Sequence, residues 1–360
     1  MKFIHTSDLH LSSEMESRLP PEKARERRKE LIATFARIAD YAAREQVTAV
    51  LLCGDIFDEG KPRFGDKKNF IDIVRSHPSV DFLCLSGNHD ESLADEPDLP
   101  ENLLCFDETW HKYSYGDTDI WGIEQTDANC ALYYSTLHAD PQRFNIVMLH
   151  GQTLPSGGKP ERDAVVLPYL RGKSIDYLAL GHIHSLKEGV LDERGVWCYC
   201  GCPEGRGFDE CGEKGFVLLD VGNDGFSRRF IPFARRTIVE RHIDLSGLSG
   251  SYEIERKILS ELRDISPENM VRVYLEGACA ESADYSVSGL EKVLGAHWYA
   301  ASVKDCTKPA VDYSAYENEL SLRGEFTRLV MNADGLEEED KLEILRCGIA
   351  ALAGEEVRFR

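Results

Sequence analysis

Five short polar segments in the first half of the chain carry side chains that can bind divalent cations. Each follows a short apolar run of the kind that forms a buried strand. The segments supply carboxylates, imidazoles and one amide, which are oxygen and nitrogen donors suited to divalent metals. They occupy residues 7–10, 54–55, 87–90, 150–151 and 181–184.

The first two segments are ambiguous when each is taken alone. Asp8 and His10 are two residues apart, so in an extended chain they project to the same side and can share one cation. Asp55 follows Gly54, whose conformational freedom allows a sharp turn. The two carboxylate oxygens of Asp55 can bridge two cations. An Asp and a His at this spacing are also common by chance, and a turn aspartate is often only solvated.

The third segment is more specific, because three different polar groups occupy consecutive loop positions. Asn88 supplies an amide oxygen, His89 an imidazole and Asp90 a carboxylate, directly after the apolar run FLCLS. An Asn-His pair that merely decorates a turn is the competing interpretation.

The last two segments add three histidines. His182 and His184 are two residues apart after the run DYLAL, and His150 ends the run NIVMLH. His150 alone is also typical of a satisfied core histidine. Because ligand sites of α/β sheets gather where strands end, the five segments together predict one shared metal site.

The elements that must position these segments indicate a layered α/β fold. Pro20 and Pro21 can open a helix whose positions Leu31, Phe35 and Ile38 share one apolar face. Strands are predicted at residues 2–6, 47–53, 80–86, 144–149 and 175–180. Three later strands, at residues 196–200, 215–221 and 226–232, are expected to form a second sheet packed on the first.

The chain is long enough for more than one domain. We expect a catalytic domain at residues 1–233 and a small α/β appendage at residues 234–312. Residues 313–360 are rich in Glu, Leu and Ala, and two helices are predicted near 316–332 and 337–352.

Composition restricts the class of protein. The 360 residues are 42% hydrophobic, which is enough for a sizeable core, and the formal net charge of -21 argues against binding nucleic acid by overall electrostatics without excluding a local basic surface. The eleven cysteines are odd in number and scattered, so we expect reduced thiols. With no signal-peptide pattern at the start and no long apolar run, a cytoplasmic location is expected.

Two other features suggest structure more than chemistry. Cys198, Cys200 and Cys202 alternate as strand residues do and match no standard zinc signature, so packing in the core is expected. The basic run at residues 25–29 is typical of the solvated face of an amphipathic helix.

The order of the motifs, D-x-H, GD, GNHD, H and GHxH, resembles the calcineurin-like metallophosphoesterase superfamily over roughly residues 1–233. Within it, the sequences GDIFD and GRGFDECGEKGF, at residues 205–216, resemble the SbcD-type DNA double-strand-break repair exonucleases and their YhaO-like relatives. The fold implied is two packed mixed β-sheets flanked by helices.

The resemblance also implies a dinuclear metal site bridged by Asp55. One metal would be bound by Asp8, His10, Asp55 and His184, and the other by Asp55, Asn88, His150 and His182. Manganese is the metal typical of the family, and the donors also suit iron or zinc. Two such cations can activate a water and neutralise charge on a phosphoryl group.

His89 lies beside a ligand but is assigned to no metal. It is the candidate for stabilising the transition state or protonating the leaving oxygen, and Asp90 for orienting that imidazole.

By resemblance, the chain is expected to be a nuclease subunit acting on DNA ends, with the appendage as a DNA-capping domain. Such subunits form homodimers and work with an SMC-like coiled-coil ATPase. The terminal helices are the candidate docking element for that ATPase. The alternative is that they form only a packed helical hairpin. No Walker A glycine loop occurs, so ATP hydrolysis would need another chain.

Three alternatives to a nuclease subunit exist at this point. A small-molecule phosphodiesterase or nucleotide pyrophosphatase would use the same metals, and the acidic net charge favours it. A phosphoprotein phosphatase of the superfamily would resemble GDxxDRG and GNHE, whereas here Glu59 follows Asp58 and Asp90 ends the third motif. A scaffold without chemistry is disfavoured, because all seven ligand positions hold competent residues.

Overall fold

In the computed structural model the chain divides into two compact units. The first comprises residues 1–241, 264–273 and 291–302, and the second comprises 242–263, 274–290 and 303–360. The structure describes residues 1–15, 19–58, 64–88, 90, 93, 98–222, 225–279, 285–309, 316 and 318–354. The boundaries expected near residues 233 and 313 stay predictions.

The first large sheet has six strands in the order β14-β13-β1-β2-β3-β4. They are β1 (Lys2–Thr6), β2 (Ala49–Cys53), β3 (Asp81–Leu85), β4 (Leu103–Cys105), β13 (Gly215–Gly222) and β14 (Gly225–Pro232). Strands β1 to β4 are parallel neighbours, whereas β13 is antiparallel to β1 and β14 to β13. The carboxyl ends of β1, β2 and β3 therefore share one edge.

The second large sheet also has six strands, in the order β11-β12-β10-β7-β6-β5. They are β5 (His111–Tyr115), β6 (Thr118–Gly122), β7 (Phe144–His150), β10 (Tyr177–Gly181), β11 (Lys187–Val190) and β12 (Val196–Tyr199). Strand β10 is parallel to both β7 and β12, and Gly181 is the register partner of His150. The ends of β7 and β10 are thus side by side.

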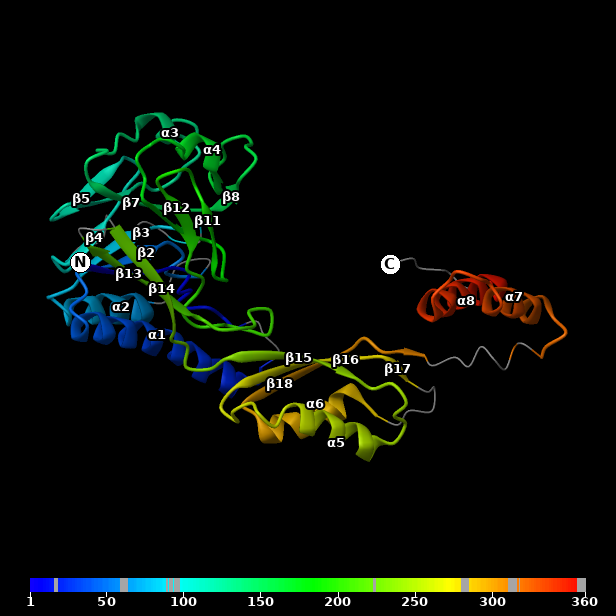
Figure 1. Cartoon of the computed structure of the whole chain (residues 1–360). Coiled ribbons are helices and arrows are strands. Elements are labelled where there is room, and N and C mark those ends of the chain that lie inside the picture. The colour runs from blue at the N-terminus through cyan, green and yellow to red at the C-terminus, as the bar shows by residue number, and fades with distance from the viewer. Residues whose placement is uncertain are drawn as a thin grey trace. The chain divides into compact units, whose positions relative to one another are not determined.

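The two large sheets lie face to face with helices on their outer sides, which gives four layers (Figure 1). Buried apolar clusters fill the space between the sheets and beneath the helices. Phe3 and Leu51 of the first sheet share a buried cluster with Ile146 and Ala179 of the second. The other face of the first sheet is covered by α1 (Pro21–Arg44) and α2 (Phe64–Arg75), and that of the second by the short helices α3 (Tyr133–Thr136) and α4 (Leu167–Leu170). A small sheet pairs β8 (Gln152–Leu154) with β9 (Ala164–Val166).

The predicted face of α1 is confirmed, because Leu31, Phe35 and Ile38 are all buried against the first sheet. The expected α/β class with two mixed sheets and flanking helices is also confirmed. Burial of Cys198, Cys200 and Cys202 agrees with their expected place in the core. All eleven cysteines lie within the described residues and are unpaired.

The expected membership of the second sheet was wrong for two strands. Of the three later strands, β12 lies in the second sheet, but β13 and β14 extend the first. Alternating apolar residues define which faces of a strand are buried but not which edge it pairs with. Here the free edge of β1 takes β13 in antiparallel register, with Phe3 opposite Leu219.

The rest of the chain contains a three-stranded sheet, two helices and a helical hairpin. The sheet has the order β15-β16-β18, with a separate pair β17-β19. The elements are β15 (Ile238–Asp244), α5 (Ser251–Glu261), β16 (Met270–Glu276), β17 (Ala278–Cys279), α6 (Val287–His297), β18 (Ala300–Asp305), β19 (Lys308–Pro309), α7 (Leu322–Met331) and α8 (Glu338–Leu352). Helix α6 ends at His297, and β18 begins at Ala300.

Among the helices of the described residues, none is long and apolar enough to cross a membrane.

Candidate metal centre

The predicted ligand residues lie where five strands of the two sheets end. Asp8 and His10 follow β1, Asp55 follows β2, and the amides of Asp8 and His10 donate to the carbonyl oxygens of Gly54 and Asp55 at 2.9 and 3.0 Å. Those backbone bonds hold the first two loops together. The remaining predicted ligands are Asn88 after β3, His150 at the end of β7, and His182 and His184 after β10.

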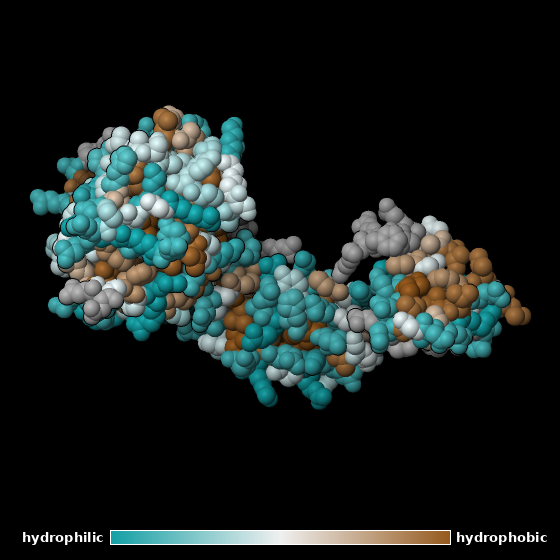
Figure 2. Space-filling model, turned by 45° about the horizontal axis from the view of Figure 1, so that its top comes forward, coloured by the Kyte–Doolittle hydropathy of each residue, from teal (hydrophilic) through white to brown (hydrophobic). Residues whose placement is uncertain are grey.

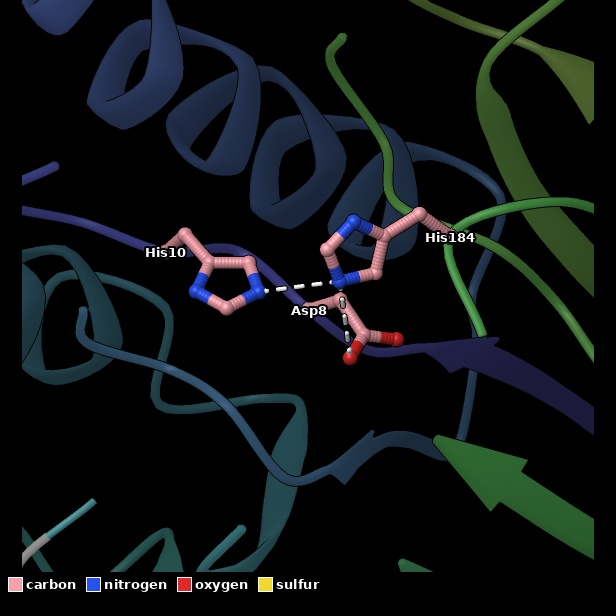
Figure 3. Close-up of side chains that lie close together, drawn as sticks. All are labelled: Asp8, His10 and His184. Carbon is pink, nitrogen blue, oxygen red and sulfur yellow. Dashed lines mark hydrogen bonds and ion pairs between the residues drawn. The ribbon is translucent and has the colours of Figure 1, made fainter. Parts of the chain in front are cut away.

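One ligand group consists of Asp8, His10 and His184 (Figure 3). The Nε2 atoms of the two imidazoles are 3.1 Å apart, and His184 Nε2 is 3.8 Å from Asp8 Oδ1. Asp8 and His10 are buried, and His184 is partly exposed. We call these residues the Asp8 group.

A second group consists of Asp55, His150 and His182, with Asn88 beside it. His150 Nε2 is 3.4 Å from Asp55 Oδ2 and 3.0 Å from Asn88 Oδ1, and His182 Nδ1 is 3.3 Å from the same amide oxygen. We call Asp55, His150 and His182 the Asp55 group.

Asp55 connects its own group to the Asp8 group. Its Oδ2 atom is 3.8 Å from His10 Nε2 of the Asp8 group and 3.4 Å from His150 Nε2 of its own group. A carboxylate in this place can contribute to two cations at once. The structure therefore brings all seven predicted metal ligands into one continuous cluster.

The donors fit divalent cations. In each group, imidazole nitrogen and carboxylate oxygen atoms lie within 4.8 Å of one another. Carboxylates and imidazoles gathered at this spacing, and largely removed from water, are stabilised by a bound cation that all of them can coordinate.

Four of the predicted ligands have a left-handed backbone conformation. The φ angles are 54° at Asp8, 44° at His10, 52° at Asp55 and 106° at His182. Such conformations cost on the order of 1 to 3 kcal/mol each in residues other than glycine, and they concentrate at functional sites. The strain re-aims side chains at the ends of strands, which a regular extended backbone would direct elsewhere.

Close packing explains the glycines of two motifs. A Cβ atom on Gly87 would lie 2.1 Å from Asp55 Oδ1, and one on Gly54 would lie 2.4 Å from His150 Nδ1. Gly54 also has a φ of 86°. Any side chain at these two positions would displace a predicted ligand.

The histidines of the Asp55 group have opposite pKa shifts in the metal-free protein. Burial lowers the pKa of His150, but the hydrogen bond and negative charge of Asp55, with the charge of Asp8, raise it overall to about 9. Burial and the neighbouring His150 lower the pKa of His182. A cation that binds His150 near neutral pH must therefore displace a proton.

Asp90 contacts the backbone of two motifs. Its carboxylate accepts hydrogen bonds from the amides of Ile56 and Phe57, at 3.0 and 2.8 Å, and from Gly87 at 3.0 Å. Burial raises the pKa of Asp90, although these three amides oppose the rise. Asp90 thus ties the loop of Asp55 to the loop of Asn88. His89, the predicted catalytic partner of Asp90, lies outside the described residues.

A pocket beside Asn88 and His150 contains residues that the sequence did not single out. Gln125, Arg162 and Asp163 line it together with the third motif. They come from loops without a recognisable motif, so no sequence signal could have assigned them.

The comparisons with known proteins agree with this geometry. A sequence model of the calcineurin-like phosphoesterase family matches residues 1–186. The uncharacterized metallophosphoesterase YhaO of Bacillus subtilis (strain 168) is 30% identical over 304 residues, which are 78% of this chain and 73% of the relative. The DNA double-strand break repair protein Mre11 of Sulfolobus acidocaldarius is 24% identical over 311 residues, covering 81% of this chain and 79% of the relative.

A third relative is a subunit of the nuclease SbcCD of Escherichia coli (strain K12), which is 24% identical over 272 residues, 62% of this chain and 66% of the relative. The family match covers more than half of the chain and includes every predicted metal ligand. The chain therefore belongs to the calcineurin-like phosphoesterase family and is a metal-dependent phosphoesterase.

Proposed function

We propose that this phosphoesterase is a nuclease subunit that hydrolyses phosphodiester bonds of DNA in DNA repair. The observation that carries the proposal is the pair of ligand groups joined at Asp55 Oδ2, because a dinuclear site suits in-line attack on a phosphodiester. The printed names of the Mre11 and SbcCD relatives support DNA as the substrate.

In this proposal the ligands divide between two divalent cations, most readily Mn²⁺, with Fe or Zn as alternatives. Asp8, His10, Asp55 and His184 would hold the first; Asp55, Asn88, His150 and His182 would hold the second. When bound, the two cations supply an activated water and neutralise phosphoryl charge. Asp55 would be a ligand shared by both cations, and His89 would protonate the leaving oxygen or stabilise the transition state.

Asp90 supports the reaction by holding the loops of Asp55 and Asn88 in register through its three backbone contacts. Arg162, which lines the neighbouring pocket, would offer a positive charge to a phosphate that enters it. Such a local contact is compatible with the net charge of -21, because bound cations offset part of the site's negative charge.

The terminal helices are proposed to dock an SMC-like coiled-coil ATPase, with DNA capped by the region after residue 234 and the protein acting as a homodimer. Helices α7 and α8 pack on each other through Val330 and Leu345, which makes them a hairpin. Large apolar side chains also gather on its surface (Figure 2). Those exposed on and around the hairpin include Leu320, Leu322, Leu329, Leu342 and Ile344. Contiguous exposed apolar surface marks partner sites in soluble proteins.

A second candidate is a small-molecule phosphodiesterase or nucleotide pyrophosphatase. The observation that favours it is the net charge of -21, which opposes a long polyanionic substrate.

The test is hydrolysis of linear duplex DNA, single-stranded DNA and bis-p-nitrophenyl phosphate, each with Mn²⁺ and with EDTA. His89→Ala and Asp55→Ala are the variants. The control is Glu188→Gln, which changes an exposed side chain of β11. Manganese-dependent DNA cleavage that both variants lose supports the nuclease. Cleavage of the small diester alone, even with an SMC-like ATPase added, supports the second candidate.

A further inference from the structure

Three charged side chains lie behind the imidazoles of the Asp8 group. Glu210 Oε1 is 2.7 Å from His184 Nδ1, and Asp58 Oδ1 is 3.3 Å from His10 Nδ1. Arg206 joins the two carboxylates, with Nη2 at 3.0 Å from Glu210 Oε1 and Nη1 at 3.5 Å from Asp58 Oδ1. Each imidazole thus has a carboxylate at the nitrogen that faces away from the other ring.

This arrangement determines which nitrogen of each ring can bind a cation. A carboxylate beside Nδ1 favours the tautomer with its proton there, which leaves the Nε2 lone pair free and makes it more basic. The Nε2 atoms of His10 and His184 are the pair that face each other at 3.1 Å. Two lone pairs directed at one another repel, whereas a cation between them is bound by both.

The segment GRGFDECGEKGF contributes most of these contacts. Arg206, Glu210 and Lys214 are spaced four residues apart in it. The Glu210 carboxylate also accepts from the Arg206 amide at 2.6 Å, and Lys214 Nζ donates to the backbone oxygen of His184 at 2.6 Å. Glu210 is 7% exposed and Lys214 5% exposed, so these are interior contacts and not surface ion pairs. The segment therefore holds both the ring and the backbone of His184.

The Asp55 group has weaker support behind its imidazoles. His150 Nδ1 faces the neutral carbonyl oxygen of Cys53 at 2.9 Å. The contact of His182 Nδ1 with Asn88 Oδ1, at 3.3 Å, joins two proposed ligands of one cation, and within the described part of the chain no ion pair joins the His182 imidazole to a carboxylate. Neutral acceptors raise the basicity of an imidazole less than carboxylates do.

Given the dinuclear site of the proposed function, we propose that Asp58, Arg206 and Glu210 are positioning residues that make the Asp8 group bind its divalent cation more tightly than the Asp55 group. Loss of a carboxylate that supports a metal-bound histidine typically weakens metal binding by about 10 to 100-fold. Removing either carboxylate is therefore expected to weaken one of two binding steps and leave the other unchanged.

The experiment titrates the metal-free, full-length protein with Mn²⁺ while electron paramagnetic resonance measures the free ion. Wild type is expected to bind two ions in two steps of different affinity. Glu210→Gln and Asp58→Asn should each weaken the tighter step by about tenfold or more. Glu188→Gln removes the charge of a carboxylate that is paired with Arg228 on the surface, and should change neither step.

A second readout is the visible spectrum of the Co²⁺-loaded protein, which reports the coordination geometry of the tighter site. It should change in Glu210→Gln and Asp58→Asn but not in the control. Thermal unfolding checks that each variant is folded. If Glu210→Gln does not fold, two other variants decide the question. Asp58→Asn lies on a different loop, and Arg206→Lys keeps the positive charge but loses the forked geometry of the guanidinium.

Two equal binding steps in wild type would overturn the proposal, as would variants that weaken both steps equally or neither. Failure of the proposed function has a different signature: wild type would bind Mn²⁺ in two steps and leave DNA uncleaved, whether or not it hydrolyses the small diester.

Discussion

Replacing Glu204 by alanine should strongly destabilise the first compact unit, which contains both large sheets. This carboxylate is 2% exposed and accepts hydrogen bonds from Arg27 Nη2 at 2.9 Å, Thr34 Oγ1 at 2.8 Å and the Arg235 amide at 2.6 Å. It thereby joins α1 to the segment that follows β12 and to the segment between β14 and β15. The Arg27 guanidinium is fully buried, so its charge depends on these partners.

The magnitude follows from the charge left behind. Removing one partner of a buried ion pair typically costs about 3 to 5 kcal/mol, because the other charge stays buried without compensation. Arg27 keeps the carboxylate of Glu30 and the backbone oxygen of Gly205, which places the expected loss near the lower end, at about 3 kcal/mol. That is a large part of the roughly 5 to 15 kcal/mol that stabilises a typical domain.

The assay is urea-induced unfolding followed by circular dichroism, with a double-mutant cycle. Arg27→Met with Glu204→Ala should be less destabilised than the sum of the single variants, because removing both partners leaves no buried charge. Glu188→Ala, which breaks an exposed pair with Arg228, should cost less than about 1 kcal/mol. A loss below about 1 kcal/mol for Glu204→Ala, or strict additivity with Arg27→Met, would refute this reasoning.

Three further predictions concern the site and the response to pH. Gly87→Ala should abolish Mn²⁺-dependent hydrolysis of bis-p-nitrophenyl phosphate, because the new Cβ would lie 2.1 Å from Asp55 Oδ1. Ser86→Ala is the matched control. Activity of Gly87→Ala within twofold of wild type would contradict the argument that a side chain at this position displaces Asp55. Burial lowers the pKa of His5 from 6.5 to about 3. The contribution of the neutral His5 to the free energy of unfolding is therefore fully present above pH 6.5, and up to about 4 kcal/mol of it is lost as the pH falls toward 3. Denaturant titrations at several pH values measure this loss, and His5→Gln should flatten the pH dependence. Because the pKa of metal-free His150 is about 9, Mn²⁺ must displace a proton when it binds, and its affinity should increase between pH 7 and 9. Calorimetry in buffers of different ionisation enthalpy measures the number of protons released. A measurement that detects no proton release would disprove this prediction.

The residues of the candidate metal site could be proposed from the sequence because chemistry and position coincide in it. Each motif combines ligand types that divalent cations accept with a place directly after a buried apolar run. Parallel strands end at a common edge, so motifs far apart in the chain could be expected to converge before any coordinates were known. The apolar face of α1 was predictable for a similar reason, since helical periodicity is a local property.

The support around the ligands was not predictable. Arg27 belongs to a basic run typical of a solvated helix face, yet it is fully buried against Glu204. Nothing local identifies Glu210 as the partner of His184, or Asp58 as that of His10. No local sequence pattern indicated the left-handed backbone at Asp8 or the pairing of β13 with the free edge of β1.

The ligand types, their order and the strands that carry them were therefore determined by the sequence alone. Which carboxylate stands behind which histidine, which arginine is buried and which edge each late strand pairs with were decided only in the tertiary structure. These features depend on contacts between segments distant in the chain. A local pattern records the polarity and period of a segment, but not the partner that packing brings against it.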